Sequence, residues 1–166
     1  YEPYFGGIAD NLANAAGVAT NGMRWGIIVD TTGNGFALSG SSYDSYAAGV
    51  TTAGFFSASS GVTDDFYIPG ALTVDATSLY PFGDIGSTTP GSGSIVDDIS
   101  VNYTNGISST DRFALIWFNT NTSASGDKYG FLTDASFVLP ADTGATIGYT
   151  GPFAGTDPVR SASNTF

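Results

Sequence analysis

Residues that can bind a cation gather in one glycine-rich segment, at positions 30–35. Its sequence is Asp30-Thr31-Thr32-Gly33-Asn34-Gly35, and the oxygens of Asp30 and Asn34 are of the kind that Ca²⁺ binds. The spacing does not match the calcium loop of an EF-hand. Aspartate and asparagine also stabilise tight turns by bonding to nearby backbone amides. We therefore favour a hairpin turn here, with calcium binding as the alternative.

Two pairs of adjacent aspartates offer a second calcium hypothesis. They are Asp64-Asp65 and Asp97-Asp98; neighbouring strands would have to bring them together, and solvated strand ends are the favoured interpretation. Neither pair suits glycoside hydrolysis, because adjacent residues of a strand point to opposite faces and cannot flank one bond. The weak calcium candidates are Asp30, Asn34, Asp64, Asp65, Asp97 and Asp98, and we expect no other cofactor.

Histidine and cysteine are absent from the sequence. Ser-His-Asp and Cys-His nucleophilic sites, and imidazole or thiolate metal sites, are therefore impossible. Disulfides cannot support the fold either. Glu2, the only glutamate, lies next to the first residue. We expect a protein that is not an enzyme.

Aromatic side chains could form a stacking surface for sugars. Trp25 and Trp117 both fall in strongly apolar segments, so we expect them in the core, where aromatic side chains contribute most. Candidates for an exposed carbohydrate surface lie in loop-like segments and are Tyr43, Tyr46, Tyr80 and Phe82. Asn102 and Asn121 begin triplets that match the glycosylation sequon, a pattern that chance also produces often.

The chain is strongly acidic. Its 166 residues include 15 acidic and 4 basic side chains, for a net charge of −11. This charge disfavours contact with nucleic acid and with anionic membrane surfaces. No apolar run approaches the roughly 18 residues of a membrane span, so we expect no insertion into a membrane. A start at Tyr1, without an initiator methionine, is typical of a mature product or of a trimmed chain, and it is compatible with removal of a signal peptide. We expect a secreted protein.

Hydrophobic periodicity predicts strands along most of the chain. Residues 23–30 form a strand with one strongly apolar face, followed by a turn and a return strand at 36–38. Residues 111–119 are apolar on both faces, which predicts a central strand, with 128–132 as its antiparallel partner. Further strands are expected at 53–57, 65–68, 71–74, 98–104, 137–139, 145–150 and 159–166.

One short helix is expected at most, at residues 8–16 before Gly17, where Ile8, Leu12, Ala15 and Ala16 share a face. About ten short strands separated by turn residues favour two packed antiparallel sheets. The predicted fold is a single all-β domain over residues 1–166, an antiparallel β-sandwich of jelly-roll type.

Both ends of the sequence are apolar and strand-like. The start is Tyr1-Glu2-Pro3-Tyr4-Phe5, and the last residues, 163–166, end at Phe166. Each arm could cap its own sheet, which we favour. Alternatively, an arm could pair with a neighbouring subunit, and a head-to-tail contact of that kind builds a filament. The assembly candidates are Tyr1, Pro3, Tyr4, Phe5 and Phe166.

Several segments resemble the exported PEP-CTERM proteins of Verrucomicrobia and related bacteria. They are the Tyr1-Glu2-Pro3 start, MRWGIIVDTTGNGF at 23–36, DRFALIWFNTNTSASGDKYGFLTDASFVLP at 111–140, and the ending at 157–166. The sorting tail of such proteins is not in this sequence, as expected after cleavage during export. The resemblance implies secretion, a place at the cell surface or in the biofilm matrix, and no catalytic residues.

Together these features favour an extracellular structural protein that assembles into a filament or surface layer. A module that binds matrix polysaccharide through loop tyrosines is the alternative from a different class. A third possibility is an adhesin stabilised by Ca²⁺.

Overall fold

The computed structural model describes residues 2–4, 12–13, 16, 22–36, 43–45, 51–58, 64–70, 99–118, 128–141, 146–148, 160–161 and 164–165. Within these ranges the regular secondary structure consists of strands alone. The prediction of an all-β chain is therefore confirmed for the described residues. A sandwich or jelly-roll arrangement stays a prediction.

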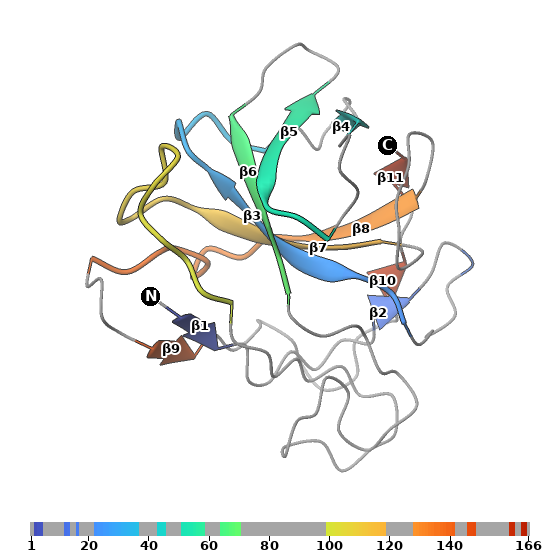
Figure 1. The fold of residues 1–166 in the computed structure, drawn as a ribbon. Coiled ribbons are helices and arrows are strands. Elements are labelled where there is room, and N and C mark those ends of the chain that lie inside the picture. Colours follow the sequence, from blue (N-terminus) through green and yellow to red (C-terminus); the bar gives the residue numbers. More distant parts are fainter. Residues whose placement is uncertain are drawn as a thin grey trace.

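The main element is a seven-stranded antiparallel sheet with the order β11-β8-β7-β3-β6-β5-β4 (Figure 1). Five strands form its body, and the short strands β4 and β11 extend it at the two edges. The bounds are β3 Trp25–Asp30, β4 Tyr43–Ser45, β5 Gly54–Ala58, β6 Asp65–Pro69, β7 Phe113–Phe118, β8 Lys128–Leu132 and β11 Asn164–Thr165.

β3 and β7 lie at the centre of the sheet and are buried along their whole length. A strand covered on both faces needs a continuous apolar run, which Phe113–Phe118 supplies. The predicted central strand and its antiparallel partner β8 are confirmed. The strands predicted near 23–30, 53–57 and 65–68 are also present, as β3, β5 and β6.

Buried side chains form a separate cluster on each face of the sheet, because neighbours along a strand point to opposite faces. The first cluster contains Met23, Trp25, Ile27, Val29, Phe66, Ile99, Val101, Ile107, Phe113, Leu115, Trp117, Phe137 and Leu139. The second contains Ile28, Phe56, Tyr67, Ile116, Phe118 and Tyr129. Both tryptophans are core residues, as predicted, and they lie opposite each other in the β3–β7 register.

Two glycines leave room for the tryptophan rings. A Cβ added at Gly130 would lie 2.0 Å from the indole of Trp117, and one added at Gly70 would lie 2.5 Å from the indole of Trp25. Each ring therefore packs directly over bare backbone, an arrangement that only glycine permits.

The segment 99–107 covers the first cluster without joining a sheet. Ile99 and Val101 are buried while Ser100 and Asn102 are exposed. Buried and exposed side chains therefore alternate here, as predicted for a strand at 98–104. The described residues 99–104 nevertheless form no strand. Tyr103 instead donates a hydrogen bond from its hydroxyl to the carbonyl of Pro140, which attaches the segment by a side chain.

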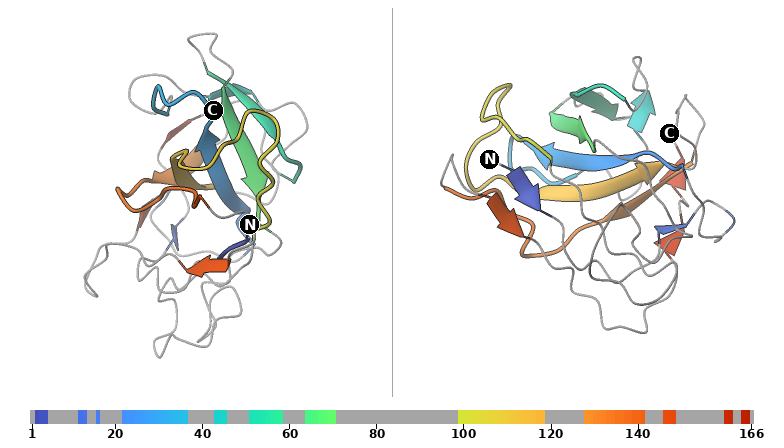
Figure 2. Two further views of the ribbon diagram at one scale, coloured as in Figure 1. Left: turned by 90° about the vertical axis from the view of Figure 1, so that its left-hand side faces the viewer. Right: turned by 60° about the horizontal axis from the view of Figure 1, so that its bottom comes forward.

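Two further pairs of strands lie beside the main sheet, and both run parallel (Figure 2). β1 (Glu2–Tyr4) pairs with β9 (Thr146–Gly148), and β2 (Leu12–Ala13) pairs with β10 (Arg160–Ser161). The antiparallel pairing predicted for the fold does not hold for these four strands.

Three local predictions are also wrong. Residues 137–139 form no strand, and only Val138 makes an isolated bridge, with Arg112. Leu12–Ala13 is a strand and not part of a helix; a helix of so few residues is marginal in isolation, and pairing with β10 outweighs its weak propensity. Phe36 lies outside any strand, because both edges of β3 are occupied by β6 and β7 and no position remains for a return strand beside it. The strand predicted at 71–74 lies outside the described residues.

Candidate functional site

The loop after β3 is organised by one buried carboxylate. Asp30 is only 2% exposed. Its Oδ1 accepts backbone N–H bonds from Thr32 at 3.3 Å, Gly33 at 2.8 Å and Asn34 at 3.3 Å, and its Oδ2 accepts one from Gly35 at 2.8 Å. Gly33 and Gly35 have φ values of 71° and 88°, which glycine adopts without strain. The tight turn predicted at this segment is present, but it does not join the two strands of a hairpin, because β3 pairs with β6 and β7.

Asp64 fastens the same loop from the segment that precedes β6. Its Oδ2 accepts a bond from the Thr32 hydroxyl at 2.6 Å and one from the Asn34 amide at 2.5 Å. Its backbone carbonyl accepts a bond from the Thr31 hydroxyl at 2.5 Å. Both carboxylates therefore stabilise the loop itself. The sequence favours this role for Asp30, whereas for Asp64 it favours a solvated strand end.

Four of the six calcium candidates meet at this end of the sheet. Asp65 lies opposite Asp30 in the β3–β6 register and is 2% exposed, and Asn34 and Asp64 are joined by the bond given above. Asp97 and Asp98 lie outside the described residues. Among the residues that the structure describes, no group of three or more acidic side chains is arranged to hold a metal ion. Calcium binding stays a prediction.

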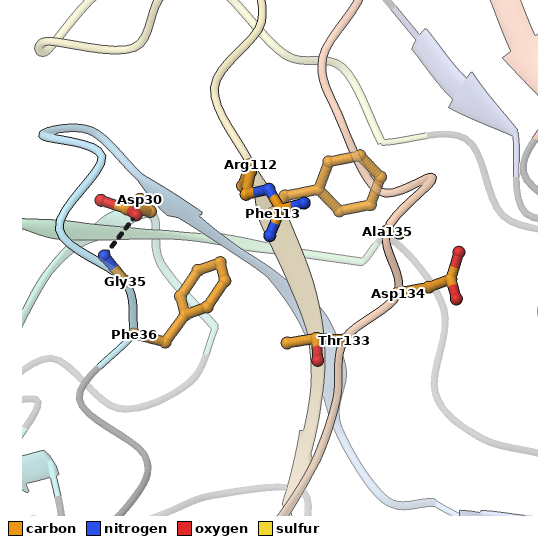
Figure 3. A pocket seen from close by; sticks show the side chains of 8 residues that line it. All are labelled: Asp30, Gly35, Phe36, Arg112, Phe113, Thr133, Asp134 and Ala135. Atoms are coloured by element: carbon orange, nitrogen blue, oxygen red, sulfur yellow. Dashed lines mark hydrogen bonds between the residues drawn. The ribbon is translucent and has the colours of Figure 1, made fainter.

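An open cleft of about 410 Å³ adjoins this loop (Figure 3). Three segments form it: the loop after β3, the residues where β7 begins, and the turn after β8. A backbone bond of 2.9 Å from the Asp30 N–H to the Arg112 carbonyl holds the first two segments together. The lining residues are Asp30, Gly35, Phe36, Arg112, Phe113, Thr133, Asp134 and Ala135.

The turn after β8 is held by Asp134. Its Oδ1 accepts bonds from the Ser136 hydroxyl at 2.5 Å and from the Ser136 N–H at 2.8 Å. These bonds lower the pKa of the Asp134 carboxyl below its ordinary value. The side chain of Asp134 therefore stays ionised at neutral pH, and it points away from the centre of the cleft (Figure 3).

Sequence reasoning did not identify the cleft. Its polar and aromatic groups, Arg112, Thr133 and Phe36, are far apart in the sequence and meet only through the pairing of β3, β7 and β8. One signal was present: Arg112 is one of only four basic residues and stands directly before the central strand.

The terminal segments pair within their own chain where they are described. Glu2, Pro3 and Tyr4 lie opposite Thr146, Ile147 and Gly148. At the other end, Asn164 and Thr165 lie opposite Tyr129 and Lys128, so β11 is the outermost strand on its side of the main sheet. Three of the assembly candidates, Tyr1, Phe5 and Phe166, lie outside the described residues.

The predicted carbohydrate surface is described at one position. Tyr43 lies in β4, opposite Ala58 of β5, whereas Tyr46, Tyr80 and Phe82 lie outside the described residues. Of the two sequon asparagines, Asn102 is exposed and Asn121 lies outside the described residues.

Among the described residues there is no helix long and apolar enough to cross a membrane. Comparison of the chain with models of protein families, with curated proteins and with solved structures gives no match.

Proposed function

We propose that this protein is a non-catalytic structural subunit of a bacterial cell surface or extracellular matrix, and that copies of it assemble by exchanging terminal strands. The observation that carries the proposal is the short backbone pairing that attaches each end of the chain. β11 is held to the sheet by two paired residues and β1 to β9 by three. Exchange of an identical element between copies preserves its pairing and is a low-cost route to assembly.

The short pairing of the terminal strands supports the exchange. The backbone hydrogen bonds that must break on release are few, and each is worth about 0.5–1.5 kcal/mol net.

Strand β8 provides the edge that accepts the exchanged strand. When β11 leaves, the outer edge of β8 presents unpaired backbone groups, which β11 of another copy can satisfy in the same register. If the donor and acceptor lie on opposite sides of the assembled copy, the contact is head-to-tail and extends into a filament.

The location outside the cell rests on composition and on the resemblance given above. A chain without cysteine depends on neither an oxidising nor a reducing compartment for its fold. Its net charge of −11 favours solubility at high dilution. The absence of histidine and cysteine supports a role without nucleophilic or metal-assisted catalysis.

A cysteine cross-link separates exchanged from unexchanged strands. Lys128 and Thr165 lie opposite each other in the β8–β11 register, at a separation suited to a disulfide, and the native chain has no cysteine to interfere. The single variants Lys128→Cys and Thr165→Cys are mixed unfolded, refolded together and oxidised. Strand exchange predicts a disulfide between one chain of each kind, seen as a covalent dimer on a non-reducing gel.

The double variant Lys128→Cys/Thr165→Cys is the matched control, because an unexchanged β11 closes its disulfide within one chain. If the double variant cross-links internally at every protein concentration and the mixed single variants give no heterodimer, strand exchange is wrong. Negative-stain electron microscopy of the native chain then shows whether any ordered polymer forms by another contact.

A further inference from the structure

The cleft beside the Asp30 loop combines one guanidinium, one aromatic ring and one hydroxyl. Arg112 is exposed, Phe36 is half-buried and Thr133 is exposed. Figure 3 shows these side chains around the same opening, with Arg112 at one end and Phe36 and Thr133 at the other. The volume of about 410 Å³ lies within the range of small-molecule sites.

Arg112 supplies the positively charged hydrogen-bond donors in the cleft. Among the described residues, no side chain forms an ion pair with it. The two acidic residues given as lining the cleft are already engaged: Asp30 accepts four backbone N–H bonds, and Asp134 accepts two bonds from Ser136. A guanidinium has five N–H donors in a planar fork that matches a carboxylate in two bonds.

Phe36 gives the cleft a fixed apolar wall. Its ring meets that of Phe131 edge to face, with 5.5 Å between the centroids. The hydrogen bond that the Gly35 N–H donates to Asp30 holds the adjoining backbone. The hydroxyl of Thr133 can both donate and accept. A ligand that matches all three groups carries a carboxylate, a saturated ring with an apolar face, and hydroxyls.

We propose that this cleft binds a uronic acid unit of an acidic polysaccharide. The carboxylate pairs with the Arg112 guanidinium, the ring lies against Phe36, and a hydroxyl bonds to Thr133. This site does not depend on strand exchange, because all its described lining residues come from one chain and lie between residues 30 and 135.

The charge of the whole protein sets the conditions of the test. A net charge of −11 repels a long polyanion at low ionic strength, whereas the Debye length falls to about 8 Å at physiological salt. The probe is therefore a short oligomer, trigalacturonate, in physiological salt. Its neutral counterpart is galactotriose, which has the same ring without the carboxylates.

Titration is followed by NMR chemical shifts or calorimetry. We expect trigalacturonate to bind at least about tenfold more tightly than galactotriose, because charge-assisted bidentate bonds are the stronger kind. Arg112→Gln should remove this preference, and Phe36→Ala should weaken both sugars. Lys128→Gln is the matched control: it removes one of the four positive charges at the far end of β8 from the cleft, and binding should not change.

Several outcomes would overturn the proposal. They are the absence of binding by either sugar, equal binding of both, and a preference that survives Arg112→Gln in a variant whose melting curve matches that of the native chain. Equal or tighter binding of a triglutamate peptide would assign the cleft to acidic peptides instead. A loss of binding in Lys128→Gln equal to that in Arg112→Gln would show that binding depends on the overall charge of the protein and not on Arg112.

Discussion

Asp30 is the residue on which the geometry of the cleft depends most. It is a buried carboxylate at the end of a central strand, and its four N–H bonds fix the course of the loop that carries Gly35 and Phe36. Asp64 acts on the same loop from outside, through bonds at an exposed position. Hydrogen bonds to a buried charge are worth more than exposed ones, so the two aspartates should differ in their effect on stability.

We expect Asp30→Asn to lower the free energy of unfolding by about 2–3 kcal/mol, because an amide group faces the Gly35 N–H with a donor and the charge is lost. Asp64→Asn is the matched control and should cost under about 1 kcal/mol. Urea denaturation followed by circular dichroism measures both. Equal losses in the two variants would contradict the central role of Asp30.

Single residues were predictable where their chemistry is local. The turn at 30–35 follows from Asp30, Asn34 and two glycines within six positions, and the tryptophans follow from their apolar neighbours. The cleft was not predictable, because Phe36 and Arg112 become neighbours only when β3 pairs with β7. No local pattern in the sequence encodes that pairing.

The apolar pattern of the sequence predicts which segments form strands, but it does not predict the order of those strands in the sheet. Phe113–Phe118 is apolar throughout and is central, as its composition predicts. β3, however, lies between β6 and β7, which are both far from it in the sequence. The segment 99–107 shows the same distinction: its alternation identifies which side chains are buried, but the backbone joins no sheet.

This segment should therefore contribute to stability as a core element does. We expect Val101→Ala to lower the free energy of unfolding by about 1–3 kcal/mol, because it removes buried methyl groups from the first cluster. The neighbouring exposed Asn102 provides the control, and Asn102→Ala should change stability by less than about 0.5 kcal/mol. Thermal or urea unfolding measures the free energy of unfolding of both variants. Similar losses in the two variants would show that segment 99–107 is not packed as part of the core.

For the whole molecule, charge opposes the proposed assembly. Each copy carries a net charge of −11, so copies repel one another until salt screens the repulsion; the Debye length is about 30 Å at 0.01 M and about 8 Å at 0.15 M ionic strength.

We therefore expect assembly, followed by light scattering, to accelerate as sodium chloride is raised from 0.01 to 0.15 M. Sucrose at matched osmolality serves as the control and should have a smaller effect. Assembly that slows with added salt would point to contacts made by ion pairs and not by strand exchange.

The packing of the tryptophans over Gly70 and Gly130 gives the protein a built-in optical probe. Trp25 and Trp117 are the only tryptophans in the chain, and each is 1% exposed. Their fluorescence should therefore stay blue-shifted while a terminal strand detaches and shift to the red only when the sheet itself melts. Emission wavelength and polymer formation can thus be recorded in one cuvette, which separates detachment of the ends from loss of the fold without any added label.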